Sequence, residues 1–332
     1  MATFSPENTA VACLYPQWWG ARGDDKHDDT SAIQAALNAA RDMGGGEVVI
    51  TKGTFKTTGT LHVWGVDQRD WGSGSLATRS IQVRGVSRRS SMIHYTGDGI
   101  CIWLCTDSVG GRDYYHSSAV VRSLHLKGTG RSGIGLQLAS PAGGGWGGSA
   151  IVENNCIESF DIGLYVTHSY GSRFSHNKVR FNNTGLQIGD AGGTGGGGAT
   201  VNGNSFRDNE FSHNHHIGVR IFYGGYNLFE GGLIEGNGDE GIYIERAANN
   251  NWVHHVTFRN IWIEGNQKGT PASNQGQAYL HSTEGAGYKA LSGITFDSCF
   301  FNCQGENFHM RLGKTIGLQL IDNRFSHPND RV

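Results

Sequence analysis

The stretch Phe229-Glu-Gly-Gly-Leu-Ile-Glu-Gly-Asn237 decides the fold of this chain, because its pattern is repeated along most of the sequence. Its first and sixth positions are apolar, and the same frame fits segments that begin at residues 152, 174, 206, 258 and 296. The six starts lie 22, 32, 23, 29 and 38 residues apart, which indicates a unit of 22 or 23 residues with insertions.

Each repeat predicts two short β-strands. Apolar and polar residues alternate over short runs within the frame, which is typical of strands and not of helices. In four copies a glycine opens a second alternating run, at Gly163, Gly185, Gly218 and Gly241. Repetition at this period predicts a solenoid, and short strands with no helix between them predict coils that stack in parallel. The sequence therefore predicts an all-β parallel β-helix.

Composition narrows the class of protein. The chain has 332 residues, 52 of them glycine, and a net charge of −2, which gives no support for a nucleic-acid or membrane partner. No apolar run reaches transmembrane length, and no basic start followed by an apolar stretch predicts a secretory signal. The six cysteines have no histidine at zinc-ligand spacing along the sequence, so we expect core or turn thiols.

The chain is predicted to have three parts: a leader at 1–14, an entry segment with a capping helix at 15–58, and the β-helix at 59–332. An apolar stripe at Ile33, Ala36, Leu37 and Ala40 predicts the helix, with Asp29 or Thr30 suited to its N-cap. The glycines at 44–46 are expected to end it.

The entry segment carries a resemblance to a known family. Its residues Trp19-Gly-Ala-Arg-Gly-Asp24, Asp28-Asp-Thr30, Ala32-Ile-Gln34, Gly44-Gly-Gly46 and Gly53-Thr-Phe55 resemble the start of the pectate-lyase-like superfamily, which includes polygalacturonase-related enzymes and bacteriophage tailspike depolymerases. The resemblance implies a right-handed parallel β-helix closed at its N-terminal end by the helix at 30–42. It also implies a carbohydrate partner, a possible homotrimer and an extracellular or virion-associated location. The catalytic signatures of polygalacturonases are absent, so no catalytic role is carried over.

Stacking the coils would align equivalent positions as ladders. Positions four and nine hold asparagines, whose amides can bond the backbone and one another along a stack. Position two alternates in charge between most neighbouring coils, which suits cross-strand ion pairs, so Glu153, Glu230 and Asp297 are interpreted as structural. The asparagines are Asn155, Asn177 and Asn209 at position four, and Asn182, Asn214, Asn237 and Asn266 at position nine.

Position seven brings two like charges together. Glu235 and Glu264 fall on adjacent coils, where in-register carboxylates would lie roughly 5 Å apart. A retaining glycosidase needs an acid and a nucleophile at about that separation. Trp262, on the same predicted face, would suit a sugar platform. The alternative is a pair of solvated glutamates that turn away from each other.

A second group of candidates lies around the second strand. Asp239 and Glu240 precede it, and equivalent turns hold Asp161, Asn183 and His216. Aromatic, amide and guanidinium groups at outward positions of this strand suit sugar rings and acidic polysaccharides, although an ordinary soluble sheet face is the alternative. The outward residues singled out for substrate binding are Tyr165, Gln187, Arg220 and Tyr243.

No metal site or cofactor is predicted. Only His213 and His215 could share a strand face, and no aspartate cluster has calcium-loop spacing.

The leading hypothesis is a polysaccharide-degrading glycoside hydrolase with Glu235, Glu264, Asp239 and Glu240 as candidate catalytic carboxylates. One alternative is a lyase or epimerase on a uronic-acid polymer, for which Arg220, Lys178, Arg180, Tyr243 and His216 could supply base and cation. A fructan-cyclising transferase and a non-catalytic phage receptor-binding protein are further alternatives.

Overall fold

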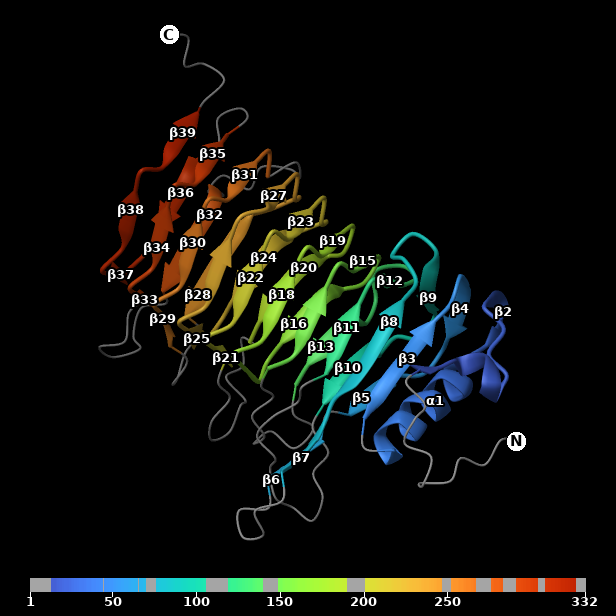
Figure 1. Cartoon of the computed structure of the whole chain (residues 1–332). Coiled ribbons are helices and arrows are strands. Elements are labelled where there is room, and N and C mark those ends of the chain that lie inside the picture. The colour runs from blue at the N-terminus through green and yellow to red at the C-terminus, as the bar shows by residue number, and fades with distance from the viewer. Residues whose placement is uncertain are drawn as a thin grey trace.

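The chain winds into coils that stack along one axis, with the N-terminal helix at one end and the C-terminal strands at the other (Figure 1). The computed structural model describes residues 13–43, 45–64, 66–69, 76–105, 119–139, 149–189, 201–246, 252–266, 276–282, 291–303 and 308–326. Within these residues all strand pairs are parallel except the β6–β7 hairpin (Val66–Arg69 and Leu76–Arg79). A right-handed parallel β-helix, as predicted from the repeat and the resemblance, is confirmed.

Each coil contributes strands to long parallel sheets, which we call the A, B, C and D sheets. The A sheet contains β1 Cys13–Leu14, β3 Gly46–Ile50, β8 Ile81–Gly85, β11 Val120–Arg122, β14 Ile151–Glu153, β18 Arg173–Ser175, β22 Ser205–Arg207, β26 Leu228–Glu230, β30 Thr257–Arg259, β34 Thr295–Asp297 and β38 Gln319–Ile321. The B sheet contains β2 Asp24–Asp28, β4 Gly53–Thr57, β9 Ser91–Tyr95, β12 His125–Lys127, β15 Cys156–Glu158, β19 Lys178–Arg180, β23 Glu210–Ser212, β27 Leu233–Glu235, β31 Trp262–Glu264, β35 Phe300–Asn302 and β39 Arg324–Ser326.

The second strand of each repeat lies in the C sheet, and a narrow D sheet completes the coil before the next A strand. The C sheet contains β5 Leu61–Trp64, β10 Ile100–Cys105, β13 Ile134–Leu138, β16 Ile162–Val166, β20 Thr184–Ile188, β24 Ile217–Ile221, β28 Ile242–Arg246, β32 Gly276–Ser282 and β36 Phe308–Leu312. The D sheet contains β17 Ser169–Tyr170, β21 Val201–Asn202, β25 Gly224–Gly225, β29 Val253–His254, β33 Leu291–Ser292 and β37 Thr315–Ile316.

The N-terminal end is covered by α1 (Thr30–Asp42), at the predicted position, with the 3₁₀ turn η1 (Pro16–Trp19) before it. The predicted stripe, including Ile33 and Leu37, is buried against the first coils. Asp29 occupies the N-cap position, but its carboxylate accepts hydrogen bonds from the backbone amides of Arg22 and Gly23. It therefore ties down the entry loop instead of capping the helix. Sheet pairing begins at β1, inside the segment predicted as a leader.

A column of phenylalanine rings fills the interior beneath the A sheet. The first frame position of five successive coils is in register, and successive ring centroids lie 4.6, 4.5, 4.7 and 5.0 Å apart. Each ring is almost fully buried, which removes a large apolar area from water at every coil. The coils therefore superimpose as the repeat predicts. The column consists of Phe174, Phe206, Phe229, Phe258 and Phe296.

Two buried asparagine ladders run along the inside of the corners. Asn182 Nδ2 donates to Asn214 Oδ1 at 3.2 Å, Asn214 Nδ2 to Asn237 Oδ1 at 2.9 Å, and Asn237 Nδ2 to Asn266 Oδ1 at 2.7 Å. The same oxygens accept backbone amides, and each Nδ2 also bonds a backbone carbonyl, so the corner's polar groups are satisfied without water. Asn155, Asn177 and Asn209 form the second predicted ladder.

Between sheets the chain turns at single residues whose backbone adopts the left-handed conformation, with positive φ. The third frame position has positive φ in every described copy, including Asn154 at 55° and Asn260 at 52°. The eighth position behaves alike, with Phe181 at 58° and His213 at 54°. A non-glycine residue in this conformation costs on the order of 1 kcal/mol. The ladder hydrogen bonds beside each corner offset that cost.

Position two forms the predicted charge ladder on the outside of the A sheet. Arg207 Nε lies 3.2 Å from Glu230 Oε2, and Arg259 Nε lies 3.0 Å from Asp297 Oδ2. Glu153, at the other end, lies 3.8 Å from Arg122. These carboxylates therefore pair with arginines on neighbouring coils and are structural, as predicted. None of the described helices is long and apolar enough to cross a membrane.

Asn214→Ala tests the ladder. The change removes an amide that bonds Asn182 and Asn237 and leaves buried backbone groups unpaired, so unfolding free energy should fall by about 1–3 kcal/mol. Urea denaturation followed by circular dichroism measures it. Asn38→Ala on α1 is the control and should stay within about 0.5 kcal/mol of wild type. Equal stability of the Asn214 variant and wild type would contradict the proposed contribution of the ladder.

Candidate functional site

A continuous column of polar and aromatic side chains runs along the outer face of the C sheet. Strand pairing places one outward residue of each coil directly beside the next; Gln187 is buried, with Nε2 donating to Gly189 O, and the others are partly buried. The leucines, valines and isoleucines that alternate with them point into the core. We call this set the C-face column: Trp103, Gln137, Tyr165, Gln187, Arg220, Tyr243, Tyr279 and Arg311.

Two adjacent tyrosines lie between two arginines at one end of the C-face column. The guanidinium of Arg220 lies 5.7 Å from the centre of the Tyr243 ring, and that of Arg311 lies 4.7 Å from the Tyr279 ring. The two tyrosine rings meet edge to face at 5.4 Å. Arg220 Nε is buried and has no hydrogen-bond partner among the described residues. Both tyrosines are thus held in place by neighbours on the same face.

A buried carboxyl lies in the turn that leads into β28. Glu240 is only 6% exposed, and burial raises its pKa, with the charge of Asp239 adding to the effect. The charges of Arg220 and Arg311 lower the pKa of Glu240, so both arginines contribute to the electrostatic field at its carboxyl group. A carboxyl whose pKa is raised by burial is suited to general-acid chemistry.

The same turn carries a histidine–aspartate pair. Asp239 Oδ2 lies 2.8 Å from His216 Nδ1, and both side chains are partly exposed. On the preceding coils Asn183 Nδ2 donates to Asp161 Oδ1 at 2.8 Å. The row of turn residues predicted from the repeat therefore lies together, beside the strands that carry Tyr165, Gln187, Arg220 and Tyr243. Asp161 and Asn183 form one pair in it, and His216 and Asp239 the next.

Further titratable groups flank Tyr243. Burial raises its pKa, and the nearby charge of Glu245 adds to this. Glu245 pairs in register with His281, whose Nδ1 lies 3.6 Å from Glu245 Oε1. Tyr243 therefore stays protonated and can donate a hydrogen bond from its hydroxyl to a ligand on this face.

The structure separates the predicted carboxylates into two places. Glu235 and Glu264 are direct strand partners, as predicted, but they lie on the B sheet, across the turn at 236–240 from the C-face column. Both carboxylate oxygens of Glu264 have partners: Trp262 Nε1 at 2.5 Å and Asn302 Nδ2 at 2.7 Å. Trp262 is 47% exposed and packs against Phe300. Asp239 and Glu240 lie instead in the turn that leads into β28 of the C sheet.

Sequence reasoning missed several residues of this face. Tyr279, His281 and Arg311 lie on β32 and β36, which follow the frame residues of their coils only after insertions that break the 22-residue spacing. The sequence pattern that could have identified Tyr279 is the alternation Ala278-Tyr279-Leu280, which repeats Ile242-Tyr243-Ile244. Strand pairing confirms that equivalence residue by residue.

A separate cluster of potential metal ligands lies on the B sheet. His125 on β12 pairs in register with Cys156 on β15, and Glu158 is two residues further along β15. Burial alone would lower the pKa of His125, but Cys156 and Glu158 outweigh it and raise the pKa to about 9. Cys156 was predicted to be a core or turn thiol. The sequence search missed the cluster because its histidine comes from the neighbouring coil.

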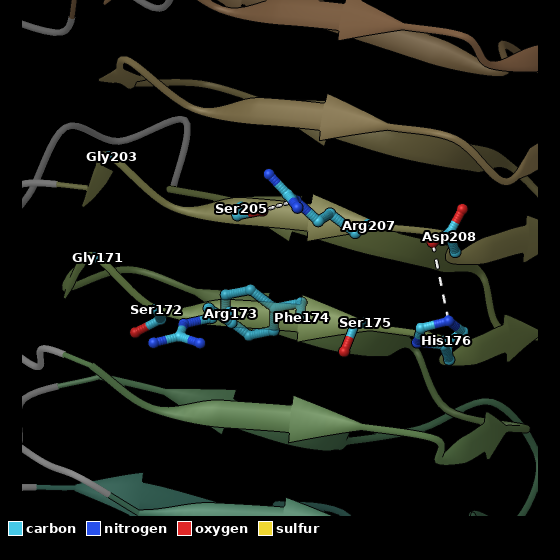
Figure 2. A pocket seen from close by; sticks show the side chains of 10 residues that line it. All are labelled: Gly171, Ser172, Arg173, Phe174, Ser175, His176, Gly203, Ser205, Arg207 and Asp208. Carbon is cyan, nitrogen blue, oxygen red and sulfur yellow. Dashed lines mark hydrogen bonds and ion pairs between the residues drawn. The ribbon is translucent and has the colours of Figure 1, made fainter.

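The A sheet carries a shallow hollow of about 620 Å³ between β18 and β22 (Figure 2). Arg173 and Arg207 lie along its floor, and His176 and Asp208 pair at one end at 3.8 Å. Arg207 also belongs to the charge ladder through Glu230. None of the residues predicted for catalysis or substrate binding lines this hollow.

Comparison with protein families gives one match over most of the repeats. The model of the family described as periplasmic copper-binding protein (NosD) matches residues 111–293. A segment of 41 residues is 51% identical to alginate lyase 7 of Azotobacter vinelandii, and this match covers 12% of the present chain and 5% of that protein.

Solved structures with the same fold include two tailspike proteins. The enzymatically active domain of bacteriophage CBA120 tailspike protein 2 aligns with a TM-score of 0.61 at 13% identity, over 96% of this chain and 43% of that one. Dettilon tailspike protein aligns with a TM-score of 0.58 at 11% identity, over 96% of this chain and 71% of that one. The parallel β-helix inferred from the entry segment is thereby confirmed as the fold.

Glu240→Gln tests the buried carboxyl through stability. Because burial raises the folded-state pKa of Glu240, the native state holds this proton more tightly than the unfolded chain, and its stability falls as pH rises through that range. The amide cannot ionise, so the variant should match wild type in mild acid and exceed it above neutrality. Urea midpoints at both pH values measure this, with exposed Asp98→Asn as control. A difference that does not change with pH would contradict the raised pKa.

Proposed function

This chain belongs to the NosD family, and we propose that it is a carbohydrate-active enzyme, a glycoside hydrolase that cleaves a polysaccharide bound along the C-face column. One observation carries the proposal. Aromatic, amide and guanidinium side chains succeed one another at each coil, and a buried carboxyl with a raised pKa lies in the turn before the strand of Tyr243. The tailspike and alginate lyase likenesses support a polysaccharide as the substrate class.

The C-face column suits an extended glycan. Successive coils lie about 4.8 Å apart, so a sugar chain lying parallel to the helix axis would meet a new side chain at every coil. Faces of Tyr165, Tyr243 and Tyr279 can pack against sugar rings, while Gln137 and Gln187 can bond hydroxyls. Such a chain would be oriented by many weak contacts before it reaches the reactive groups.

The proposed chemistry uses two groups in the turn before β28. Glu240, whose pKa is raised by burial, would protonate the glycosidic oxygen as the bond breaks. His216, held by Asp239, would remove a proton from the attacking water. Tyr243 and Arg220 would hold the sugar in position on the same face.

A lyase or epimerase acting on a uronic-acid polymer is the second candidate, because two guanidinium groups lie on the C-face column. Arg220, whose Nε has no hydrogen-bond partner among the described residues, and Arg311 could bind the sugar carboxylate and stabilise the charge that develops when the adjacent proton is removed. Of the cations predicted for this chemistry, Lys178 and Arg180 lie on the B sheet.

Other predictions stay open. The Glu235–Glu264 pair with Trp262 is a second place for hydrolysis, and the separation of its strands suits the retaining arrangement. Association as a homotrimer and an extracellular or virion-associated location are proposals that the tailspike likeness supports. Fructan cyclisation and non-catalytic receptor binding remain alternatives.

The family description also names copper. Among the described residues, a donor set that suits a soft ion is the thiol, imidazole and carboxylate of Cys156, His125 and Glu158. These residues lie on the B sheet, away from the C-face column, so the hydrolysis proposed above uses none of them.

A screen of purified polysaccharides tests the proposed reaction. A hydrolase should release reducing ends without new ultraviolet absorbance, whereas a lyase should create unsaturated sugars that absorb near the ultraviolet edge. Product masses then identify the repeating unit. Binding without either product would contradict both enzymatic proposals and support the receptor-binding alternative.

Paired glutamine substitutions locate the site. Glu240→Gln should lower kcat on the active polysaccharide by about 10²–10⁴-fold, because it removes the proton donor, while binding and fold persist. Glu264→Gln is the matched control on the B sheet and should keep most of the activity. If Glu264→Gln and Glu235→Gln abolish turnover while Glu240→Gln does not, the site lies on the B sheet.

Arg220→Gln separates the two chemistries. On a uronic-acid polymer, loss of the guanidinium should raise KM and lower kcat together, because the carboxylate loses a charged partner. On a neutral glycan only the positioning contact is lost, so the effect should be smaller than on the acidic polymer. Comparing the same variant on a neutral and an acidic substrate measures the difference, and a large effect on the neutral glycan would contradict carboxylate recognition.

A further inference from the structure

Three metal-ligand side chains meet on the outer face of the B sheet, apart from the glycan-binding column. His125 and Cys156 are Cα partners on adjacent strands, and Glu158 follows Cys156 on the same strand face. Their donor atoms all lie within 4.8 Å of one another. Neither the repeat nor the proposed hydrolysis requires this combination, since the asparagine ladders and ring column hold the coils in register.

The separations of the donor atoms are within about half an ångström of those around a tetrahedral ion. His125 Nε2 lies 3.0 Å from Glu158 Oε1, and Cys156 Sγ lies 3.8 Å from Glu158 Oε2. Ligand bonds of about 2.0–2.3 Å in tetrahedral geometry separate neighbouring donors by roughly 3.3–3.7 Å. The two oxygens of Glu158 thus face the two other donors, so that small side-chain rotations would direct all three groups at one point.

The donor types select a class of ion. A thiolate and an imidazole favour zinc or cuprous copper over magnesium or calcium, which prefer oxygen ligands alone. We propose that His125, Cys156 and Glu158 form a binding site for one thiophilic metal ion. Three protein ligands leave a fourth position of a tetrahedral ion to an exogenous ligand. The site goes beyond the proposed glycan chemistry and does not depend on it.

The surrounding charges fit a divalent ion. With Cys156 ionised, the ligand set carries two negative charges, which balance Zn²⁺. Lys127 and Arg180 stand in register with Glu158 on the coils on either side, and Arg180 Nε lies 3.5 Å from Glu158 Oε2. Lys127 and Arg180 can stay beside the Glu158 carboxylate when an ion binds, so Glu158 keeps both neighbouring cations.

The cluster lies on the outer surface of the B sheet. Cys156 is buried, and the side chains of His125 and Glu158 are 16% and 14% exposed. On its other side His125 pairs with Met92, which places a thioether side chain one coil away on the same face. Cysteine, histidine and methionine side chains are ligands that also suit cuprous copper.

Equilibrium dialysis of the purified, chelator-treated chain tests the proposal. One Zn²⁺ should bind per chain, and Cys156→Ser, His125→Gln and Glu158→Gln should each weaken binding by at least about 10-fold. Parallel dialysis with Cu⁺ under reducing conditions shows which thiophilic ion is preferred. Mg²⁺ and Ca²⁺ should not compete.

Cys13 provides a matched control. Its thiol also donates to a carboxylate, Glu47 Oε2 at 3.3 Å, but no histidine joins that pair in the described structure. Cys13→Ser should therefore bind the ion as wild type does. Cobalt substitution adds a spectroscopic readout, because a thiolate-to-cobalt absorption band should appear in wild type and Cys13→Ser and be missing in Cys156→Ser.

A measurement on the unmodified chain guards against variants that fold poorly. Zn²⁺ should slow alkylation of Cys156 relative to Cys13, as followed by peptide mass spectrometry. The proposal is overturned if wild type retains no ion, if Cys156→Ser binds with unchanged affinity, or if Mg²⁺ competes equally with Zn²⁺.

Discussion

Register between coils is the constraint on which the rest of this structure depends. Parallel strands can slip, and a shift of one residue would move every core side chain to the surface. Stacked rings from Phe174 to Phe296 and the buried amides of the asparagine ladders oppose such a slip, because both require the same residue type at the same height in successive coils. A coil out of step would leave amides unpaired in the core.

Because the register is fixed, equivalent outward residues of successive coils form columns on each outer face. Each coil contributes one residue to a column, and the residue types determine the chemistry of that column. On the A sheet the columns alternate arginine and carboxylate, and the charges neutralise one another. On the C sheet, aromatic rings, amides and guanidinium groups succeed one another beside Glu240, whose pKa is raised by burial. The same scaffold therefore supports one face whose charges pair with one another and another on which the buried Arg220 Nε has no hydrogen-bond partner in the described part of the chain.

The sequence predicted the repeat, the ladders and the strand pairing of Glu235 with Glu264, because all of these follow from the spacing of residues within one frame. It predicted Arg220, Tyr243 and the row from Asp161 to Asp239 for the same reason. Tyr279, His281 and Arg311 were not predicted, since insertions displace them from the frame. The cluster at His125, Cys156 and Glu158 was missed because ligand spacing was sought along the chain, whereas the ligands come from two coils.

What the sequence determined by itself is the solenoid: period, alternation and the recurrence of phenylalanine and asparagine specify which residues face inward and how coils align. Only the tertiary structure decided which polar groups are buried, which carboxylates are paired, and which residues from separate coils share a surface. Those properties depend on neighbours roughly one coil away in space but more than twenty residues away in sequence, and insertions change that distance from coil to coil. Glu240 shows the difference, because its place in the turn follows from the repeat, but its burial and raised pKa follow from the coils packed around it.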